Sequence, residues 1–266
     1  LDLLMNFNNP YMRCNQGIVV ECKNRQMRSI NQAELDKWLE ELINAIECAQ
    51  SAPELQDFDM GNTMLNTGLL LIHANDSFNS ELFNKYLCNL KVHSRRNPIN
   101  VFIAGNDEID RWNSLRNKIE KDFTSEFQFI YPSIEGSNME LGNYLTINQL
   151  YSKYIFAQDM KYIEKTEAST SYKVPQVRKI MISFDEISKG NFKYMWSMFK
   201  ALQFQDAKEL VFVFYPRKNS DVEFVKDNFI NTLYQIQQPI TENIASRIKI
   251  EFIDNRSLSP VDMGGR

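Results

Sequence analysis

Apolar residues near the start of the chain change from strand-like runs to helix-like spacing. Short apolar runs predict strands at residues 1–5 and 17–23, separated by a turn rich in asparagine and proline. Leucine and isoleucine then recur every three or four positions, which predicts a helix that begins near Asn31 and turns one face inward. Glu34, three residues after Asn31, completes a capping box typical of a helix start.

The alternation of strand and helix continues along the rest of the chain. Further strands are predicted at residues 68–74, 99–104, 127–131, 154–156, 179–184, 210–215 and 248–253. Further helices are predicted at residues 80–90, from 107 onward, 192–204 and 222–237, and a polar exposed loop at 164–174. This order predicts an α/β fold with a mixed or largely parallel sheet. The sequence shows no internal repeat.

Residues 132–150 hold the expected boundary between two parts of the chain. Pro132, Gly136 and Gly142 interrupt the strand and helix patterns there. We therefore divide the chain into an α/β domain over residues 1–140 and a second α/β lobe over residues 141–266. The second lobe is either a domain of its own or an extension of the first sheet, and we expect it to supply substrate or partner contacts.

Composition narrows the class of protein. The chain has 266 residues, of which 43% are hydrophobic and 24% charged, as in ordinary globular proteins. It contains no apolar run long enough to cross a membrane and no signal-peptide pattern, so we expect a cytoplasmic protein without a membrane partner. The four cysteines form no CxxC pair, which favours a reducing compartment and argues against a zinc ribbon. Because the chain opens with Leu1 inside a strand, we expect the full gene product to contain residues before it.

Charge is distributed unevenly along the chain. Residues 1–150 carry 13 Lys and Arg against 20 Asp and Glu, a net −7, whereas residues 151–266 carry 17 against 14, a net +3. A basic coat over the whole protein is therefore absent. Any binding of nucleic acid must depend on local patches of positive charge.

The charged end of the second predicted strand is the best candidate for chemistry. Side chains alternate between the two faces of a strand, so Glu21 and Lys23 point the same way. Asp2 would face the same spot if the strands at residues 1–5 and 17–23 pair as a hairpin. Two carboxylates at one point suit Mg²⁺, which prefers oxygen ligands. A lysine beside them could orient or help to deprotonate an attacking water, or neutralise charge on a phosphate.

Asp2 followed by Glu21-Cys22-Lys23, on two successive strands before a helix, resembles the core of the PD-(D/E)xK nuclease superfamily. The resemblance covers roughly residues 1–105 and implies a restriction-endonuclease-like mixed sheet flanked by helices. It implies metal-dependent hydrolysis of phosphodiester bonds, with Mg²⁺ or Mn²⁺ held by Asp2, Glu21 and the carbonyl of Cys22. Lys23 would then serve the water and the scissile phosphate. The helix that usually precedes the first strand is missing from the sequence.

Three further residues are candidates around this centre. Some members of the superfamily add a glutamine at the start of the following helix, and Gln32 stands there, although a capping box with Ser29 explains it equally well. Branches with a Gln-x-x-x-Tyr signature would have tyrosine where this chain has Asp36. Arg25 and Arg28 form a basic loop that either contacts phosphates or is simply solvated. A second basic turn contains His93, Arg95 and Arg96.

These observations leave two functions open. The first is a metal-dependent DNA endonuclease, for which the resemblance suggests a prokaryotic restriction or anti-phage defence complex. The second is a non-catalytic subunit that keeps the nuclease fold and binds a partner protein or nucleic acid. The acidic first half favours the second function, because substrate would approach a negative surface. The acid–acid–lysine set favours the first, which we expect, with DNA as substrate and a partner subunit or a second copy of the chain as partner.

Overall fold

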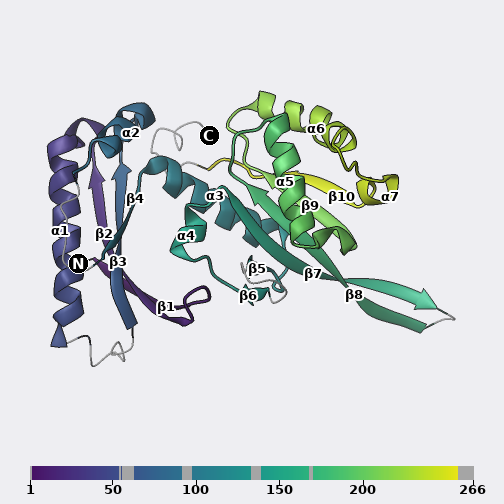
Figure 1. Cartoon of the computed structure of the whole chain (residues 1–266), viewed down its shortest axis with the longest axis horizontal. Helices are drawn as coiled ribbons and strands as arrows, with labels where there is room; N and C mark the ends of the chain where they lie inside the picture. The colour runs from purple at the N-terminus through teal and green to yellow at the C-terminus, as the bar shows by residue number, and fades with distance from the viewer. Residues whose placement is uncertain are drawn as a thin grey trace. The chain divides into compact units, whose positions relative to one another are not determined.

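A computed structural model describes residues 2–53, 55, 63–91, 98–132, 139–167 and 170–256 (Figure 1). The chain divides into two compact units, which we call the first unit (Leu1–Asn113) and the second unit (Ser114–Asn255). Each unit is built around its own mixed β-sheet with helices packed against it. The predicted α/β class is thereby confirmed.

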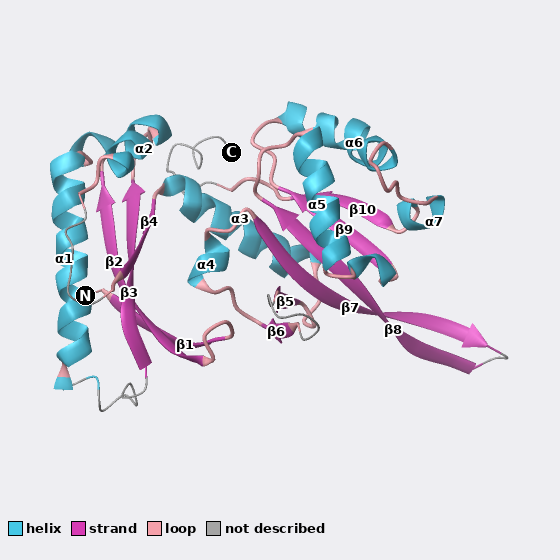
Figure 2. Cartoon of the chain, viewed as in Figure 1, coloured by secondary structure: helices cyan, strands magenta, loops and turns pink. Residues whose placement is uncertain are grey.

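The sheet of the first unit combines a hairpin with two parallel strands (Figure 2). Its strands are β1 (Leu3–Asn9), β2 (Cys14–Arg25), β3 (Thr63–Ala74) and β4 (Asn100–Ala104), in that spatial order. β1 pairs antiparallel with β2, while β3 and β4 follow in parallel. The two parallel connections carry the helices α1 (Gln32–Ser51) and α2 (Ser80–Cys88).

Helix α1 lies along one face of this sheet and forms most of the core of the first unit. The Asn31 side chain caps it by accepting a hydrogen bond from the Glu34 N–H at 3.2 Å, which confirms the predicted start. Its buried apolar face packs against apolar strand residues such as Val19 and Leu70. Gly68 permits this close approach, because a Cβ atom there would lie 2.7 Å from Ile46 Cδ1.

The second unit contains a sheet of six strands in the order β10-β9-β8-β7-β5-β6. These strands are β5 (Gln128–Tyr131), β6 (Glu140–Gly142), β7 (Tyr154–Glu167), β8 (Thr170–Ser183), β9 (Glu209–Phe214) and β10 (Ile248–Phe252). The helices are α3 (Asn106–Asp122), α4 (Ile147–Leu150), α5 (Lys189–Ala201), α6 (Asn219–Tyr234) and α7 (Glu242–Ala245). Helix α3 begins in the first unit and ends in the second. β8, β9 and β10 run parallel, and β7 is antiparallel to β8.

Two expectations differ from this architecture. The division after Asn113 precedes the boundary that we expected near residue 140, because β5 pairs with β7 and Leu115 of α3 packs into the core of the second sheet. The segment 164–174, expected to be a loop, belongs to a long hairpin formed by β7 and β8. Beyond residue 160 this hairpin extends as a two-stranded arm, so its side chains lack the burial pattern by which strands are recognised (Figure 1).

No helix in the described part of the chain is both long enough and apolar enough to cross a membrane.

Candidate functional site

The hairpin of β1 and β2 brings the two predicted acidic residues to one end of the first sheet. The strands pair antiparallel with Leu3 opposite Val20, and continuing this register by one residue places Asp2 opposite Glu21. Directly opposed residues in an antiparallel pair share a face of the sheet. The Asp2 carboxylate also accepts a hydrogen bond from the Cys22 N–H at 2.7 Å. The predicted pairing is confirmed, and it sets Asp2 beside Glu21.

Lys23 lies on the same face as Glu21, two residues further along β2. Its Nζ atom is 3.3 Å from Glu21 Oε2. Val19, which precedes them on the same face, packs in the core beneath α1, so this face is the one that the helix covers. Glu21 is only 8% exposed, whereas Asp2 is open to solvent. The site therefore has a buried side toward α1 and an open side at the start of β1.

Helix α1 contributes a third carboxylate that the sequence analysis missed. Glu41 Oε2 lies 3.3 Å from Lys23 Nζ, and the other Glu41 oxygen lies 3.9 Å from Lys37 Nζ. Glu41 sits between the buried residues Trp38 and Leu42, at the margin of the apolar face of the helix. An acid at such a margin is the one sequence signal that could have indicated it.

The two glutamates raise the pKa of Lys23 and so keep it charged. Burial by itself lowers the pKa of this lysine, but the hydrogen bonds and negative charges of Glu41 and Glu21 outweigh burial and leave the pKa raised. Lys23 is therefore a cation at neutral pH. A protonated lysine can attract a phosphate or donate a hydrogen bond to water, but it cannot take up a proton.

Cys22 contributes its backbone to this arrangement. Burial and the charges of Asp2 and Glu21 raise the pKa of its thiol, outweighing the opposite effect of Lys23. The side chain points to the face opposite Glu21, so the protonated thiol is no candidate nucleophile. Its N–H binds Asp2, and in a strand the carbonyl of the same residue faces the same edge. The carbonyl thus remains the only candidate ligand that Cys22 offers.

These residues fit an incomplete magnesium site. Among the residues that the structure describes, no group of three or more His, Cys, Asp and Glu side chains could hold a metal ion. Asp2 and Glu21 nevertheless offer two carboxylates at one end of the sheet. Mg²⁺ is commonly held by one or two carboxylates, with waters and substrate phosphates completing its shell. The donor set suits a metal that binds together with substrate better than a preformed cage.

Gln32 lies on a different side of α1 from Glu41. The two residues are nine positions apart, which is two and a half turns, so they point in opposite directions and lie about 13.5 Å apart along the axis. The Gln32 amide donates instead to Asp36, with 3.4 Å between the nitrogen and the oxygen. The helix residue that contacts Lys23 is Glu41, whereas we expected Gln32 to lie close to the site.

The predicted basic loop follows β2 directly. Arg25 is exposed and its guanidinium donates to the Asn24 carbonyl oxygen at 3.1 Å. Arg28 is exposed in the short 3₁₀ turn Met27–Ser29. Both cations are open to solvent, as a phosphate contact would require. The second basic turn, His93, Arg95 and Arg96, lies outside the described residues.

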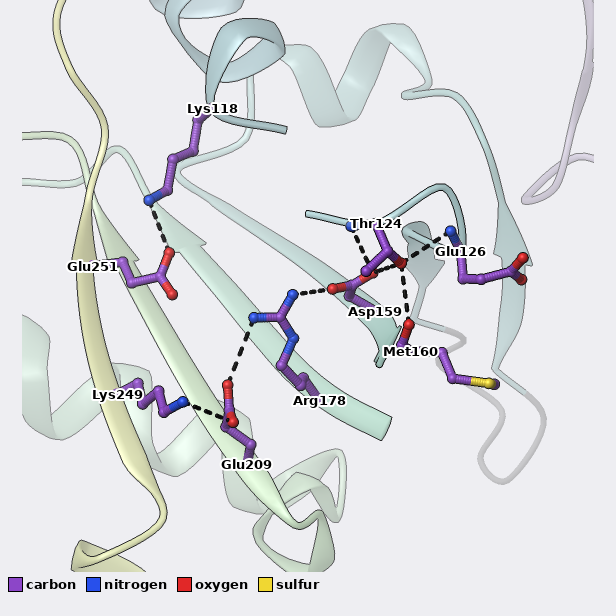
Figure 3. Close-up of polar contacts among 9 residues, drawn as sticks. All are labelled: Lys118, Thr124, Glu126, Asp159, Met160, Arg178, Glu209, Lys249 and Glu251. Atoms are coloured by element: carbon purple, nitrogen blue, oxygen red, sulfur yellow. Dashed lines mark hydrogen bonds and ion pairs between the residues drawn. The ribbon is translucent and has the colours of Figure 1, made fainter. Parts of the chain in front are cut away.

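A buried charged cluster in the second unit is structural in character (Figure 3). Arg178 of β8 forms an ion pair with Asp159 of β7, and these side chains are 2% and 0% exposed. Arg178 Nη1 also lies 3.6 Å from Glu209, which pairs with Lys249 at 2.9 Å. Thr124 donates its backbone N–H to Asp159 at 3.2 Å. Because Arg178 and Asp159 are enclosed, the cluster joins neighbouring strands and offers no access to a ligand.

Comparison with known families agrees with the geometry of the first unit. Residues 1–108 match the family model described as the GAPS4 protein PD-(D/E)XK nuclease domain. Comparisons with curated proteins and with solved structures gave no match. The matched range contains the hairpin, both parallel strands and the residues Asp2, Glu21 and Lys23. The match over residues 1–108 supports the assignment of this domain to the PD-(D/E)xK nuclease superfamily.

Proposed function

We propose that this protein is a metal-dependent endonuclease that hydrolyses DNA phosphodiester bonds in anti-phage defence. The observation that carries the proposal is the meeting of Asp2, Glu21 and Lys23 on one face at one end of the first sheet. The match to a nuclease domain of a defence family supports the biological setting. A partner subunit or a second copy of the chain would complete such a complex.

The chemistry follows from the charges of the three residues. Asp2 and Glu21 would hold Mg²⁺ or Mn²⁺, which polarises the phosphate and lowers the pKa of a bound water. Protonated Lys23 would stabilise the negative charge that develops on the scissile phosphate. Of the roles open to this lysine, its raised pKa favours charge stabilisation over removal of a proton from water.

Glu41 acts on the phosphate only through Lys23 and is therefore a positioning residue. Together with Glu21 it holds the ammonium group from two sides, at 3.3 Å each. Such a fixed ammonium needs little rearrangement when charge develops on the phosphate. The interaction also explains why an exposed glutamate stands at the edge of the apolar face of α1.

A non-catalytic subunit is the second candidate function. The net charge of −7 over residues 1–150 opposes the approach of a polyanion. A retained nuclease fold could then serve to bind a partner protein or nucleic acid. The proposed nuclease activity and this alternative differ in whether the full chain cleaves a nucleic acid.

Cleavage of plasmid and linear DNA with Mg²⁺ or Mn²⁺ tests the proposal. The wild-type protein should cleave, and EDTA should abolish cleavage. Glu21→Ala should lower the rate by about 10²–10³, the usual cost of removing one preorganised electrostatic contact from a transition state. Glu81→Ala removes an exposed carboxylate from α2 and should leave the rate unchanged.

Two outcomes would count against the proposal. Equal cleavage by the wild type and Glu21→Ala would place the activity elsewhere in the chain or in a contaminant. Absence of cleavage of both DNA and RNA, with candidate partner proteins supplied, would favour the non-catalytic subunit.

A further inference from the structure

The two units repeat one chain topology. In the first unit the order is β1-β2-α1-β3-α2-β4. The second unit contains the order β7-β8-α5-β9-α6-α7-β10, in which the short helix α7 is an addition. Each begins with an antiparallel hairpin and continues through two helical connections to two parallel strands that add on the same side. In each unit both helices pack in one core on one face of the sheet. The sequence shows no internal repeat, so the repeat is one of topology alone.

Aligning the two hairpins shows which residues of the second unit replace the candidate site. Tyr154 opposes Ser183 in the pairing of β7 with β8, as Asp2 opposes Glu21. Met181, two residues before Ser183, packs beneath α5, so Ser183 faces α5 as Glu21 faces α1. Asp185 then takes the place of the lysine, two residues after Ser183.

At these positions of the second unit, Tyr154 and Asp185 form a hydrogen-bonded cluster together with Lys153. The Tyr154 hydroxyl donates to Asp185 Oδ2 at 2.6 Å, and Lys153 Nζ lies 2.8 Å from Asp185 Oδ1. The Asp185 carboxylate also accepts the Glu186 N–H at 2.9 Å. Its oxygens are therefore engaged by three donors from the protein itself.

A different alignment of the hairpins leads to the same conclusion. A shift of two residues, which also preserves the faces, puts Ser152, Asp185 and Ile187 at the three positions. Neither register supplies two carboxylates with a lysine. The second unit therefore retains the fold of the first without the residues that would cleave.

The same end of the second sheet carries exposed cations. Lys189 begins α5 after β8, and Arg217 and Lys218 follow β9, so these exposed side chains stand at the carboxyl ends of adjacent parallel strands. Ligands of α/β sheets bind outside these strand ends. Asp221, the acid nearest to Arg217 and Lys218 in sequence, accepts their backbone N–H groups at 3.0 Å and 3.2 Å. Glu186, the acid nearest to Lys189 in sequence, is exposed. No ion pair joins the three cations to an acid within the described residues.

We infer that the second unit is a non-cleaving copy of the nuclease fold that binds the phosphate backbone of nucleic acid through Lys189, Arg217 and Lys218. The inference rests on the proposed function for its ligand class, which is the substrate of the first unit. Residues 1–113 carry 10 Lys and Arg against 15 Asp and Glu, a net −5, whereas residues 114–255 carry 18 against 18 and are neutral. The second unit therefore repels a polyanion less than the first, and its binding would depend on the local group of three cations. The acidic unit would cleave a polyanion that the second unit helps to retain.

Binding of a labelled DNA duplex to the full chain tests this inference. Glu21→Ala serves as the background so that cleavage does not interfere. Replacing Lys189, Arg217 and Lys218 together by alanine should weaken binding and reduce the slope of log affinity against log salt by about 3, about 1 for each phosphate that no longer meets a cation. Circular dichroism and thermal melting should show an intact fold, since all three side chains are exposed.

A matched variant controls for net charge. Lys161, Lys165 and Lys173 are exposed on the β7/β8 arm, and replacing them by alanine removes the same charge from the same unit. This variant should bind almost as the background does. An equal loss of affinity in both triple variants would mean that only the net charge of the protein affects binding. That result would overturn the assigned site. Binding by the Lys189, Arg217 and Lys218 variant that equals binding by Glu21→Ala alone, or no binding by any of these proteins, would also overturn it.

The binding result is independent of the cleavage result. If the wild type cleaves but the Lys189, Arg217 and Lys218 variant binds normally, the inference fails and the proposed function stands. If the wild type does not cleave but this variant loses binding, the proposed function fails and the inference stands.

Discussion

Lys23 shows how neighbouring side chains limit the role of a single residue. Its pKa is raised because two glutamates outweigh the effect of burial. A raised lysine pKa means that the charged form persists below that pKa and disappears as the pH rises through it. Cleavage that depends on the ammonium should therefore persist into alkaline solution beyond the usual lysine range.

Glu41→Gln tests this dependence on charge. The substitution removes one of the two carboxylates that raise the pKa of Lys23, so the alkaline limb of the pH–rate profile should move to lower pH. Loss of positioning should also lower the rate at neutral pH by about tenfold, as for other residues that orient a catalytic group. An unchanged alkaline limb would contradict this role, because a purely structural effect would lower the rate without moving it.

Lys23 and its neighbour Cys22 form a matched pair for mutation. Lys23→Ala should lower the cleavage rate by about 10²–10³, because it removes a cation that contacts the developing charge. Cys22→Ala should leave the rate unchanged, because only the Cys22 backbone contacts Asp2 and the side chain faces away from the site. A rate measurement on both variants checks the pair, and strong loss of activity in Cys22→Ala would mean that the thiol faces the reacting atoms.

At the scale of residues, the sequence predicted the features that depend only on the alternation of side chains along a strand. Asp2, Glu21 and Lys23 follow from two-residue alternation and a short hairpin, so their neighbourhood could be predicted. The meeting of Glu41 with Lys23 depends on how α1 packs on the sheet, which no local pattern contains. Gln32 was predicted to belong to the site because it begins the helix. The helical rise, however, places it more than two turns away from Glu41, the helix residue that contacts Lys23.

At the scale of elements, the buried cluster around Arg178 ties the base of the β7/β8 arm to the second sheet (Figure 3). The arm beyond it is a two-stranded ribbon, which has little stability by itself. Arg178→Ala should lower the free energy of unfolding by about 3–5 kcal/mol, because Asp159 would remain buried without a partner. Urea unfolding of the second unit measures this change.

Lys161→Ala is the control for that experiment. Lys161 is exposed on the same hairpin, and removing it should change the free energy of unfolding by less than about 0.5 kcal/mol. Equal stability of Arg178→Ala and Lys161→Ala would show that the buried ion pair contributes nothing net. Arg178→Met should cost less than a full truncation if packing provides part of the effect.

The elements also show where pattern reading fails. The start of α1 was predictable because Asn31 caps it directly. The long β7/β8 hairpin was not, because its outer half has no buried face to produce alternation. The boundary was placed at a stretch with Pro132 and Gly142, but that stretch connects β5, β6 and β7 within one unit, so a break in local pattern did not mark a break between cores.

At the scale of the whole molecule, the repeated topology was invisible in the sequence. Strand pairing and helix packing preserve the order of elements while every side chain of the candidate site changes, as the exchange of Glu21 for Ser183 illustrates. Because the second unit keeps the topology but not the polar residues of the candidate site, its sequence contains no motif that would indicate the repeat. The match to a nuclease family likewise ends at residue 108, near the end of the first unit.

The single candidate cleaving centre among the described residues predicts how the proposed nuclease cuts duplex DNA. Each phosphodiester cleavage breaks one strand, so a chain with Asp2, Glu21 and Lys23 in only one of its two units should first convert supercoiled plasmid to nicked circles. Linear DNA requires a second centre on the opposite strand, and its formation should rise more steeply with protein concentration than nicking does. Gel electrophoresis of a time course at several protein concentrations measures both products.

Linear DNA that appears at the lowest concentrations without a nicked precursor would mean that two centres act together, from a second copy of the chain or from the second unit. Asp185→Ala separates these sources, because it would change the product ratio only if the second unit cleaves.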